Sequence, residues 1–416
     1  MIDQITALHA RRAIEALRAG VPNRDAVRAL GFADDPLVEE LDRRLDTLAA
    51  GAPDGGGLLL AAEFGGGKSH ALEYLRHRAL ERNIAVSKVV VSKETQLFDP
   101  LKLFRSAVDN LAVDDRTGAV FDDIATTRLN SDPHRDRFAE LGAWLQTSGL
   151  NACFAASMWL FEHARANAEL QSRLVAFWGG GALKLTELKK DLRLCGRAGY
   201  YPLEKIRARD LARERFVFLA RLLQAAGYDG WLLLLDELEL VGRYSVLQRA
   251  RSYGELARLL GLDDQGPIPG LFTVGAITPD FESAVLLGKD DYNQIGFRMR
   301  ARGDAESELT AVLAERVMER MRGGFLSIRR PEQGTLEATF ARLAAVYQAA
   351  YDVPPERPPV IFDGTWQMRE YVRSWITRWD LRRFAPDHEA HPVVFPMPVD
   401  YTENVVLERP PENGED

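Results

Sequence analysis

The sequence predicts an α/β fold in which a parallel β-sheet is flanked by helices. Strand-length apolar runs occur at 58–61, 84–92, 231–235 and 271–277. A segment with helical spacing of its apolar residues follows the first run and leads into the second, which is the order of a parallel βαβ unit. The stretch from about 112 to 210 shows helical patterns and no strand pattern, so we expect it to be a helical insertion.

The N-terminal part of the chain predicts three helices before the sheet begins. Apolar residues recur at helical spacing over 3–19 and 37–50, and Asn23 is suited to cap a short helix between them. We therefore expect residues 1–50 to form an N-terminal helical segment.

A nucleotide-binding sheet domain is expected over 51–304, and it contains the predicted insertion. A flexible glycine-rich stretch leads into its first strand, and Thr278 and a proline follow its last strand. Apolar spacing predicts helices in this domain over 68–83, 100–111, 138–146, 152–174, 183–194, 211–226 and 252–260.

The rest of the chain is predicted to be helical and then extended. Helical patterns at 309–321, 336–351 and 366–384 indicate a C-terminal helical lid domain over 305–386. Repeated prolines and an acidic end predict an extended tail over 387–416.

The composition narrows the possible functions. The 416 residues are 46% hydrophobic and 27% charged, which is enough for a large core and two or three compact units. A net charge of -8 argues against attraction of the whole chain to nucleic acid, so any contact with DNA must be a local basic patch. Neither the two cysteines nor His70 and His77 have metal-ligand spacing, so we expect these histidines to be packing or surface residues. No apolar run can cross a bilayer and no secretory signal is visible, so a cytoplasmic protein without membrane contact is expected.

Residues 62–69, Ala-Glu-Phe-Gly-Gly-Gly-Lys-Ser, match the Walker A pattern A-x-x-x-x-G-K-S, the P-loop of many NTPases. Glycines let such a loop turn its backbone N–H groups toward phosphates, and the next helix adds its positive N-terminus. Lys68 is expected to reach the β- and γ-phosphates of ATP, and the Ser69 hydroxyl to ligate Mg2+. The alternative is a chance Gly-Lys-Ser at a helix entry, which the strand-helix-strand order disfavours. The residues predicted to contact the nucleotide are Ala62, Glu63, Phe64, Gly65, Gly66, Gly67, Lys68, Ser69 and His70.

A second motif, Trp-Leu-Leu-Leu-Leu-Asp-Glu at 231–237, has the form of Walker B. At the carboxyl edge of a parallel sheet, Asp236 is expected to hold Mg2+ through water, and Glu237 to polarise the attacking water. Taken alone the motif is weak, because Asp-Glu can begin a solvated loop that continues through Glu239. Its place after a Walker A motif favours the functional interpretation.

Further candidates are a threonine and three arginines. Thr278 follows a strand, where ATPases place a polar residue that contacts the γ-phosphate or positions water, although a threonine before proline is also common there. Arg369 begins a helix similar to the lid helix that carries a sensor 2 arginine. Arg298 and Arg300 occupy the region where AAA+ proteins keep an arginine finger, which acts across a subunit interface and so predicts a homo-oligomer. Each arginine can equally be a surface residue.

Four segments are informative when taken together: 13–22 (AIEALRAGVP), 63–70 (EFGGGKSH), 86–95 (VSKVVVSKET) and 233–237 (LLLDE). With them the sequence resembles the BREX-system ATP-binding proteins of the BrxC/BrxD family. The resemblance implies an AAA+ fold, ATP and Mg2+ as ligands, and a role in bacterial defence against phage beside DNA methyltransferase, phosphatase-like and helicase components. It also implies action on or near DNA, without identifying a DNA-reading residue, and it carries over the roles of Lys68, Ser69, Asp236 and Glu237. The long insertion is absent from many AAA+ proteins, so the substrates of clamp and helicase loaders are not carried over.

The sequence thus predicts an ATPase that acts with DNA as a motor or switch, coupling ATP at a subunit edge to movement of the lid. The second interpretation is a nucleotide-gated scaffold that binds ATP with little turnover and recruits a helicase or DNA-modifying partner; the presence of Glu237 favours turnover. A small-molecule kinase is disfavoured by the insertion and the arginine-bearing lid. The DNA form, the protein partner, the number of subunits, and the choice of ATP over GTP stay open.

Overall fold

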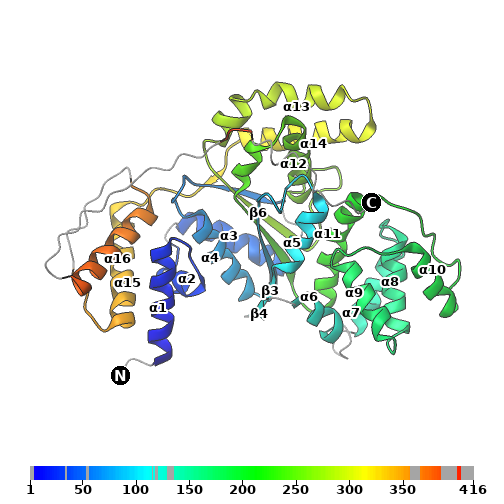
Figure 1. Ribbon diagram of the computed structural model, residues 1–416, viewed down its shortest axis with the longest axis horizontal. Helices are drawn as coiled ribbons and strands as arrows, with labels where there is room; N and C mark the ends of the chain where they lie inside the picture. The colour runs from blue at the N-terminus through cyan, green and yellow to red at the C-terminus, as the bar shows by residue number, and fades with distance from the viewer. Residues whose placement is uncertain are drawn as a thin grey trace.

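The computed structural model describes residues 4–32, 35–52, 56–114, 116–117, 120–128, 135–356, 366–385 and 401–403. Across these ranges a seven-stranded sheet has the order β4-β3-β2-β5-β6-β1-β7 (Figure 1). The strands from β2 through β5, β6 and β1 to β7 are parallel, and β3 and β4 add antiparallel pairs at one edge. The predicted parallel sheet is therefore a mixed one. The strands are β1 (Leu58–Ala61), β2 (Ile84–Val90), β3 (Leu111–Val113), β4 (Arg116–Thr117), β5 (Gly230–Asp236), β6 (Leu271–Ile277) and β7 (Leu326–Ser327).

Helices make up most of the remaining described residues. They are α1 (Gln4–Ala19), α2 (Arg24–Leu30), α3 (Asp35–Ala49), α4 (Lys68–Leu80), α5 (Pro100–Asp109), α6 (Val120–Asp123), α7 (Arg135–Leu145), α8 (Ala152–His163), α9 (Ala168–Trp178), α10 (Leu185–Leu194), α11 (Ala208–Ala225), α12 (Val246–Leu259), α13 (Asp291–Arg300), α14 (Ala305–Arg322), α15 (Gln333–Tyr351) and α16 (Met368–Phe384). The described residues also form the π-helices η1 (Ile124–Arg128) and η4 (Glu282–Leu287) and the 3-10 helix η3 (Leu238–Arg243).

The central strands are apolar at nearly every position because both faces of the sheet are covered. β5 and β6 are buried along their whole length, and strands buried on both sides show continuous apolar runs instead of alternation. In contrast, β3 and β4 lie where the sequence showed no strand pattern. With three and two residues, they are too short to give a period of two.

Two hydrophobic cores lie on opposite faces of the sheet. Leu58 and Leu60 of β1 pack with α3 and α4 on one face, whereas Leu59 and Ala61 belong to the core on the other face. This alternation is the period of two of a β-strand. The second core includes α5, α11 and α12, so the domain has three layers (Figure 1).

The helices of the predicted insertion extend the second core beside α11 (Figure 1). The sequence predicted one helix over 152–174, but the structure has α8 and α9 there. Asn167 separates them, because its side-chain oxygen accepts a hydrogen bond from the Leu170 N–H and caps α9.

The N-terminal and C-terminal helices meet in a third, smaller core. We call α1, α2, α15 and α16 the four-helix unit; they pack around aromatic residues that include Phe340, Tyr347, Trp375 and Trp379. This differs from the predicted grouping, with an N-terminal segment over 1–50 and a lid over 305–386. α3 packs on the sheet and α14 shares the sheet core with α12 and α13, because an amphipathic pattern shows that a helix buries one face but not against which element.

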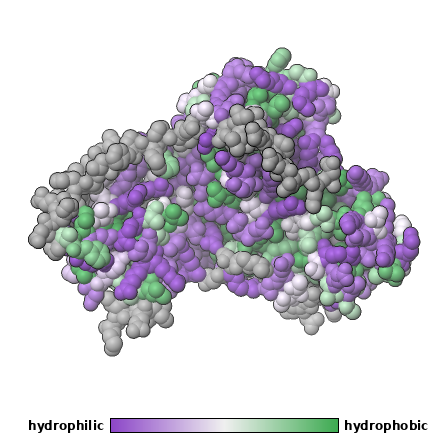
Figure 2. All heavy atoms as spheres, in the orientation of Figure 1, coloured by the Kyte–Doolittle hydropathy of each residue, from purple (hydrophilic) through white to green (hydrophobic). Residues whose placement is uncertain are grey.

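Of the predicted tail 387–416, the structure describes residues 401–403, and the other tail residues lie outside the described part. These three residues lie against the sheet domain, where Tyr401 packs on its hydrophobic core. In the described part of the chain, no helix is long and apolar enough to cross a membrane. The face shown in Figure 2 is mostly hydrophilic, including much of the hairpin formed by α13 and α14.

Candidate functional site

The sheet topology brings three predicted segments to one edge. β6 lies between β1 and β5, and the three strands are parallel, so their carboxyl ends are adjacent. The glycine-rich loop therefore follows β1 at the same edge where Thr278 follows the neighbouring strand β6, and Asp236 ends β5 one strand farther along this edge. The Ala62 N–H donates to the Ile277 carbonyl oxygen at 3.3 Å and ties the start of the loop to β6.

The loop turns tightly because its glycines adopt conformations that other residues disfavour. Gly65 and Gly67 have φ of 81° and 103°, in the left-handed region that favours glycine. A Cβ on Gly66 would lie 3.0 Å from the Glu63 carbonyl oxygen. Gly67 caps α4, whose first N–H groups lack carbonyl partners within the helix and can bind an anion.

Lys68 is the first residue of α4 and is held inside the protein. Its Nζ donates to the Ala62 carbonyl oxygen at 2.8 Å and lies 3.4 Å from Oε1 of Glu239. The side chain of Glu239 is 3% exposed, and its Oε2 has no hydrogen-bond partner among the described residues. Burial raises the pKa of Glu239 to about 7, although the neighbouring Lys68 ammonium acts in the opposite direction.

Glu239 is a residue that the sequence interpretation missed. The sequence suggested a solvated acidic loop, whereas η3 follows β5 directly and carries Glu239 into the protein. A signal was present, because Leu238 and Val241 are apolar and both are buried.

Asp236 and Glu237 end β5 with two carboxylates in different surroundings. Asp236 is buried, and its Oδ2 lies 3.2 Å from Nζ of Lys88, a lysine of β2 that the sequence interpretation did not single out. Glu237 has φ of 61°, a conformation that costs non-glycine residues of the order of 1 kcal/mol and is found at functional sites. Burial and the neighbouring Asp236 raise the pKa of Glu237, while Lys68, Arg369 and Lys88 act in the opposite direction.

Thr278 is buried at the end of β6, and its partner comes from the C-terminal tail. Its Oγ1 lies 2.6 Å from the phenol oxygen of Tyr401. No sequence pattern predicts this contact, because the two residues are 123 positions apart.

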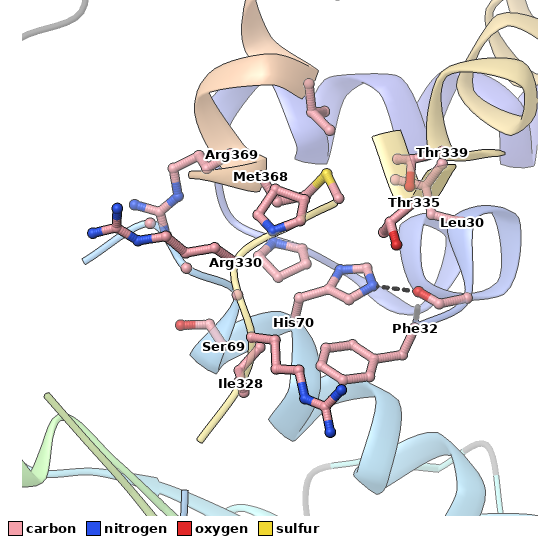
Figure 3. A pocket seen from close by; sticks show the side chains of 18 of the residues that line it. Leu30, Phe32, Ser69, His70, Ile328, Arg330, Thr335, Thr339, Met368 and Arg369 are labelled. Atoms are coloured by element: carbon pink, nitrogen blue, oxygen red, sulfur yellow. Dashed lines mark hydrogen bonds between the residues drawn. The ribbon is translucent and has the colours of Figure 1, made fainter. Parts of the chain in front are cut away.

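A cavity of about 330 Å³ opens between the glycine-rich loop and the four-helix unit. Figure 3 shows the side chains that line it, with Ser69 and His70 from α4, Phe32 from the segment after α2, and Met368 from α16. Apolar residues predominate in its wall, with Arg329, Arg330 and Arg369 as cationic members. The apolar residues include Leu17, Pro22, Leu30, Phe32, Ile328, Met368 and Val372.

His70 links α4 to the end of α2. Its Nε2 is 2.7 Å from the Gly31 carbonyl oxygen, and its ring stacks on Phe32 with centroids 6.1 Å apart. Burial lowers the pKa of His70, which favours the neutral ring. The residue therefore contributes a hydrogen-bonded wall of the cavity.

The start of α16 lies against the glycine-rich loop. The guanidinium of Arg369 lies over the Phe64 ring at 5.2 Å from its centroid, and burial together with Arg373 lowers the pKa of Arg369. Glu63 accepts hydrogen bonds from Gln367 at 2.6 Å and from Arg330 at 2.7 Å. No pattern in the sequence predicted these two contacts of Glu63.

Arg298 and Arg300 are not brought to this loop within one chain. Both are exposed on α13, which Figure 1 shows apart from α4. The guanidinium of Arg300 forms salt bridges to Glu308 and Glu315 of α14, the latter at 2.6 Å.

The polar groups described at this site include carboxylates, hydroxyls, the ammonium of Lys68 and the guanidinium of Arg369. Among the described residues, no group of three or more His, Cys, Asp and Glu could hold a metal ion. The carboxylate of Asp236 and the Ser69 hydroxyl are two of the oxygen groups at this edge of the sheet. Such an edge can receive a phosphate-bearing ligand, with the loop, Lys68 and Arg369 as its cationic side.

Residues 5–129 and 204–318 match the family described as "BREX system ATP-binding protein BrxC/D". The matched residues include the loop, Asp236, Glu239 and Thr278, and they leave out α7 to α10, α15 and α16. No curated protein and no solved structure matches the chain. Because the match spans more than half of the sequence and contains the carboxyl ends of β1, β5 and β6, the chain belongs to the family of BREX system ATP-binding proteins BrxC/D.

Proposed function

We propose that this protein binds Mg-ATP at the sheet edge and hydrolyses it, as an AAA+ type P-loop ATPase that acts as a DNA-associated switch or motor in phage defence. The convergence of the Gly65–Gly67 turn, Asp236 and Thr278 at the ends of adjacent parallel strands carries this proposal. Membership of an ATP-binding family supports the nucleotide, and BREX is a phage-defence system.

The cavity provides a place for the base and the ribose of ATP. Its volume of about 330 Å³ lies within the range of small-ligand pockets. A base seated near Phe32 and Met368 leaves the phosphates at the loop and the first turn of α4. Ser69 and Asp236 supply the oxygen donors that Mg2+ prefers, and Mg2+ commonly completes its shell with water and substrate phosphates.

Each charged residue at the edge has a distinct role in the proposed hydrolysis. Lys68 moves its ammonium from Glu239 to the phosphates, and Mg2+ when bound neutralises part of the phosphate charge. Glu237 orients the attacking water and accepts its proton, a role that suits a half-buried carboxylate with a raised pKa. Arg369 lies beside the loop and stabilises charge on the transferred phosphoryl group.

The four-helix unit is the proposed lid. Glu63 of the loop is joined to Gln367 and Arg330, so a change at the phosphates reaches the helices directly. Arg298 and Arg300 are proposed to act on a neighbouring subunit of a homo-oligomer, because they are exposed and lie apart from the loop of their own chain. DNA and other defence-system proteins, such as a helicase or methyltransferase, are the proposed partners.

Steady-state phosphate release with and without duplex DNA tests the proposal. We expect the wild type to turn over, Lys68→Ala to lose nucleotide binding, and Glu237→Gln to bind ATP but release phosphate about a hundredfold more slowly, the lower end of what a general base contributes. A wild type that binds ATP no better than Lys68→Ala would remove the ATPase assignment. If DNA changes neither turnover nor sedimentation, the coupling to DNA is wrong.

A nucleotide-gated scaffold is the second candidate. It is favoured by two contacts, that of Lys68 with Glu239 and that of Thr278 with Tyr401. Both occupy side chains that are proposed to act in hydrolysis. A wild type that binds ATP but releases phosphate as slowly as Glu237→Gln would favour the scaffold.

A further inference from the structure

Residues 401–403 are docked at two points on the sheet domain, and Tyr401 at one of them contacts Thr278 of the proposed ATPase site. The ring of Tyr401 lies against Gly242, where an added Cβ would be 2.7 Å from the ring. Glu403 accepts a hydrogen bond from Nη1 of Arg249 at 2.9 Å. The Arg249 side chain is 2% exposed and is also paired with Asp291, which is 0% exposed, so the tail contacts a rigid, buried ion pair.

The hydrogen bonds of Tyr401 fix the direction of the hydrogen bond at Thr278. The phenol has one proton and lies 3.0 Å from Oδ1 of Asp280 as well as 2.6 Å from Oγ1 of Thr278. An ionised carboxylate can only accept, so both bonds form together when Tyr401 donates to Asp280 and Thr278 donates to Tyr401. The charge-assisted bond to the carboxylate favours the same assignment.

This assignment limits what Thr278 can do. A threonine hydroxyl has one proton, and here that proton is directed to Tyr401. The hydroxyl oxygen can still accept a hydrogen bond from a water molecule. The hydroxyl cannot at the same time donate a hydrogen bond to a phosphate oxygen, because its one proton is already engaged. We propose that Tyr401 is a positioning residue that holds Thr278 as a hydrogen-bond acceptor for the attacking water. The inference rests on the proposed ATPase function, and it places the C-terminal segment in that site.

The pKa of Tyr401 is consistent with this direction. Burial raises it, the bond that Tyr401 donates to Asp280 raises it further, and the bond from Thr278 lowers it. The phenol therefore stays protonated at neutral pH. The neighbouring charged groups are Asp280, Glu239 and, through residue 403, Arg249.

The test is a double-mutant cycle in the full chain. Tyr401→Phe keeps the ring and removes the hydroxyl, and Thr278→Val removes its partner. We expect each change to lower kcat about tenfold with KM within about twofold, because the contact acts on the water and not on ATP binding. The double variant should be no slower than either single variant. Tyr200→Phe, on a side chain that is 57% exposed in the insertion, is the matched control and should leave turnover unchanged.

The same cycle measured by thermal unfolding reports the contact independently of turnover. Non-additive changes in the unfolding midpoint confirm the hydrogen bond between Tyr401 and Thr278, whether or not the wild type hydrolyses ATP. If the wild type is inactive, the ATPase assignment fails, and the positioning role of Tyr401 fails with it. Additive midpoints would overturn the inference whatever the activity. A Tyr401→Phe variant with unchanged or higher kcat, or with a changed KM alone, would also overturn it.

Discussion

Replacing Glu239 by Gln should tighten ATP binding, because Glu239 and the nucleotide phosphates compete for the same ammonium. In the structure, Nζ of Lys68 lies 3.4 Å from the Glu239 carboxylate. Gln has the same size and removes the charge while keeping a hydrogen-bonding oxygen. The substitution therefore frees Lys68 for the phosphates and also removes a buried negative charge that repels them.

The size of the effect follows from the distance. Two unit charges 3.4 Å apart attract by about 5 kcal/mol at an effective dielectric constant of 20. Release of under a third of that attraction, about 1.4 kcal/mol, lowers Kd tenfold. We therefore expect Glu239→Gln to bind ATP about tenfold more tightly at pH 8.

The difference should depend on pH, and its sign is fixed by the pKa. Burial raises the pKa of Glu239 to about 7, so the side chain is mostly neutral at pH 6 and mostly charged at pH 8. Competition for Lys68 thus appears as the pH rises through 7, and the two proteins should converge below it. The nucleotide titrates in both proteins, so its contribution cancels in the comparison.

Fluorescent ATP analogues titrated at pH 6 and pH 8 measure the two affinities. Lys68→Ala provides the baseline without the ammonium, and adding Glu239→Gln to it should have a much smaller effect. Equal affinities of wild type and Glu239→Gln at pH 8, or weaker binding by the variant, would refute competition for Lys68.

Other substitutions test the remaining parts of the structure. Arg369→Ala should weaken ATP binding about tenfold, since a hydrogen bond to a charged group is worth about 1.5–3 kcal/mol. The matched Arg298→Ala, at an exposed position of α13, should leave the affinity of the monomer unchanged in the same titration. Asp291→Ala leaves the guanidinium of Arg249 buried without its carboxylate and should cost about 3 kcal/mol in the free energy of unfolding; denaturant titration measures it, and a loss below 1 kcal/mol contradicts the buried pair. Trp375→Ala opens the core of the four-helix unit and should destabilise it by about 3 kcal/mol, which calorimetry would show as a lowered transition; an unchanged transition argues against that core.

The sequence predicted the structure most accurately where an element depends on residues close together in the chain. The bounds of β1 and β6 coincide with apolar runs, and the glycine pattern predicted the turn before Lys68. The adjacency of Asp236 to that turn could also be expected, because a strand that follows a βαβ unit in a parallel sheet ends at the same edge.

The sequence was least informative where a contact joins distant segments. Nothing local to Tyr401 identifies Thr278 as its partner. In the sequence Glu239 continues the acidic run of Asp236 and Glu237, and only the turn of η3 brings it beside Lys68. The pairing of α1 and α2 with α15 and α16 has the same origin, since amphipathic periodicity does not specify which faces meet.

The four-helix unit has a consequence for how the protein is made. Its helices α1 and α2 are synthesised well before α15 and α16. The apolar faces that α1 and α2 bury against α15 and α16 therefore stay exposed to solvent while the intervening sheet domain is synthesised. One wall of the cavity is formed by Met368 and Arg369, so it is completed only after α15 has been synthesised. A nascent chain that stops before α16 therefore lacks this wall of the cavity.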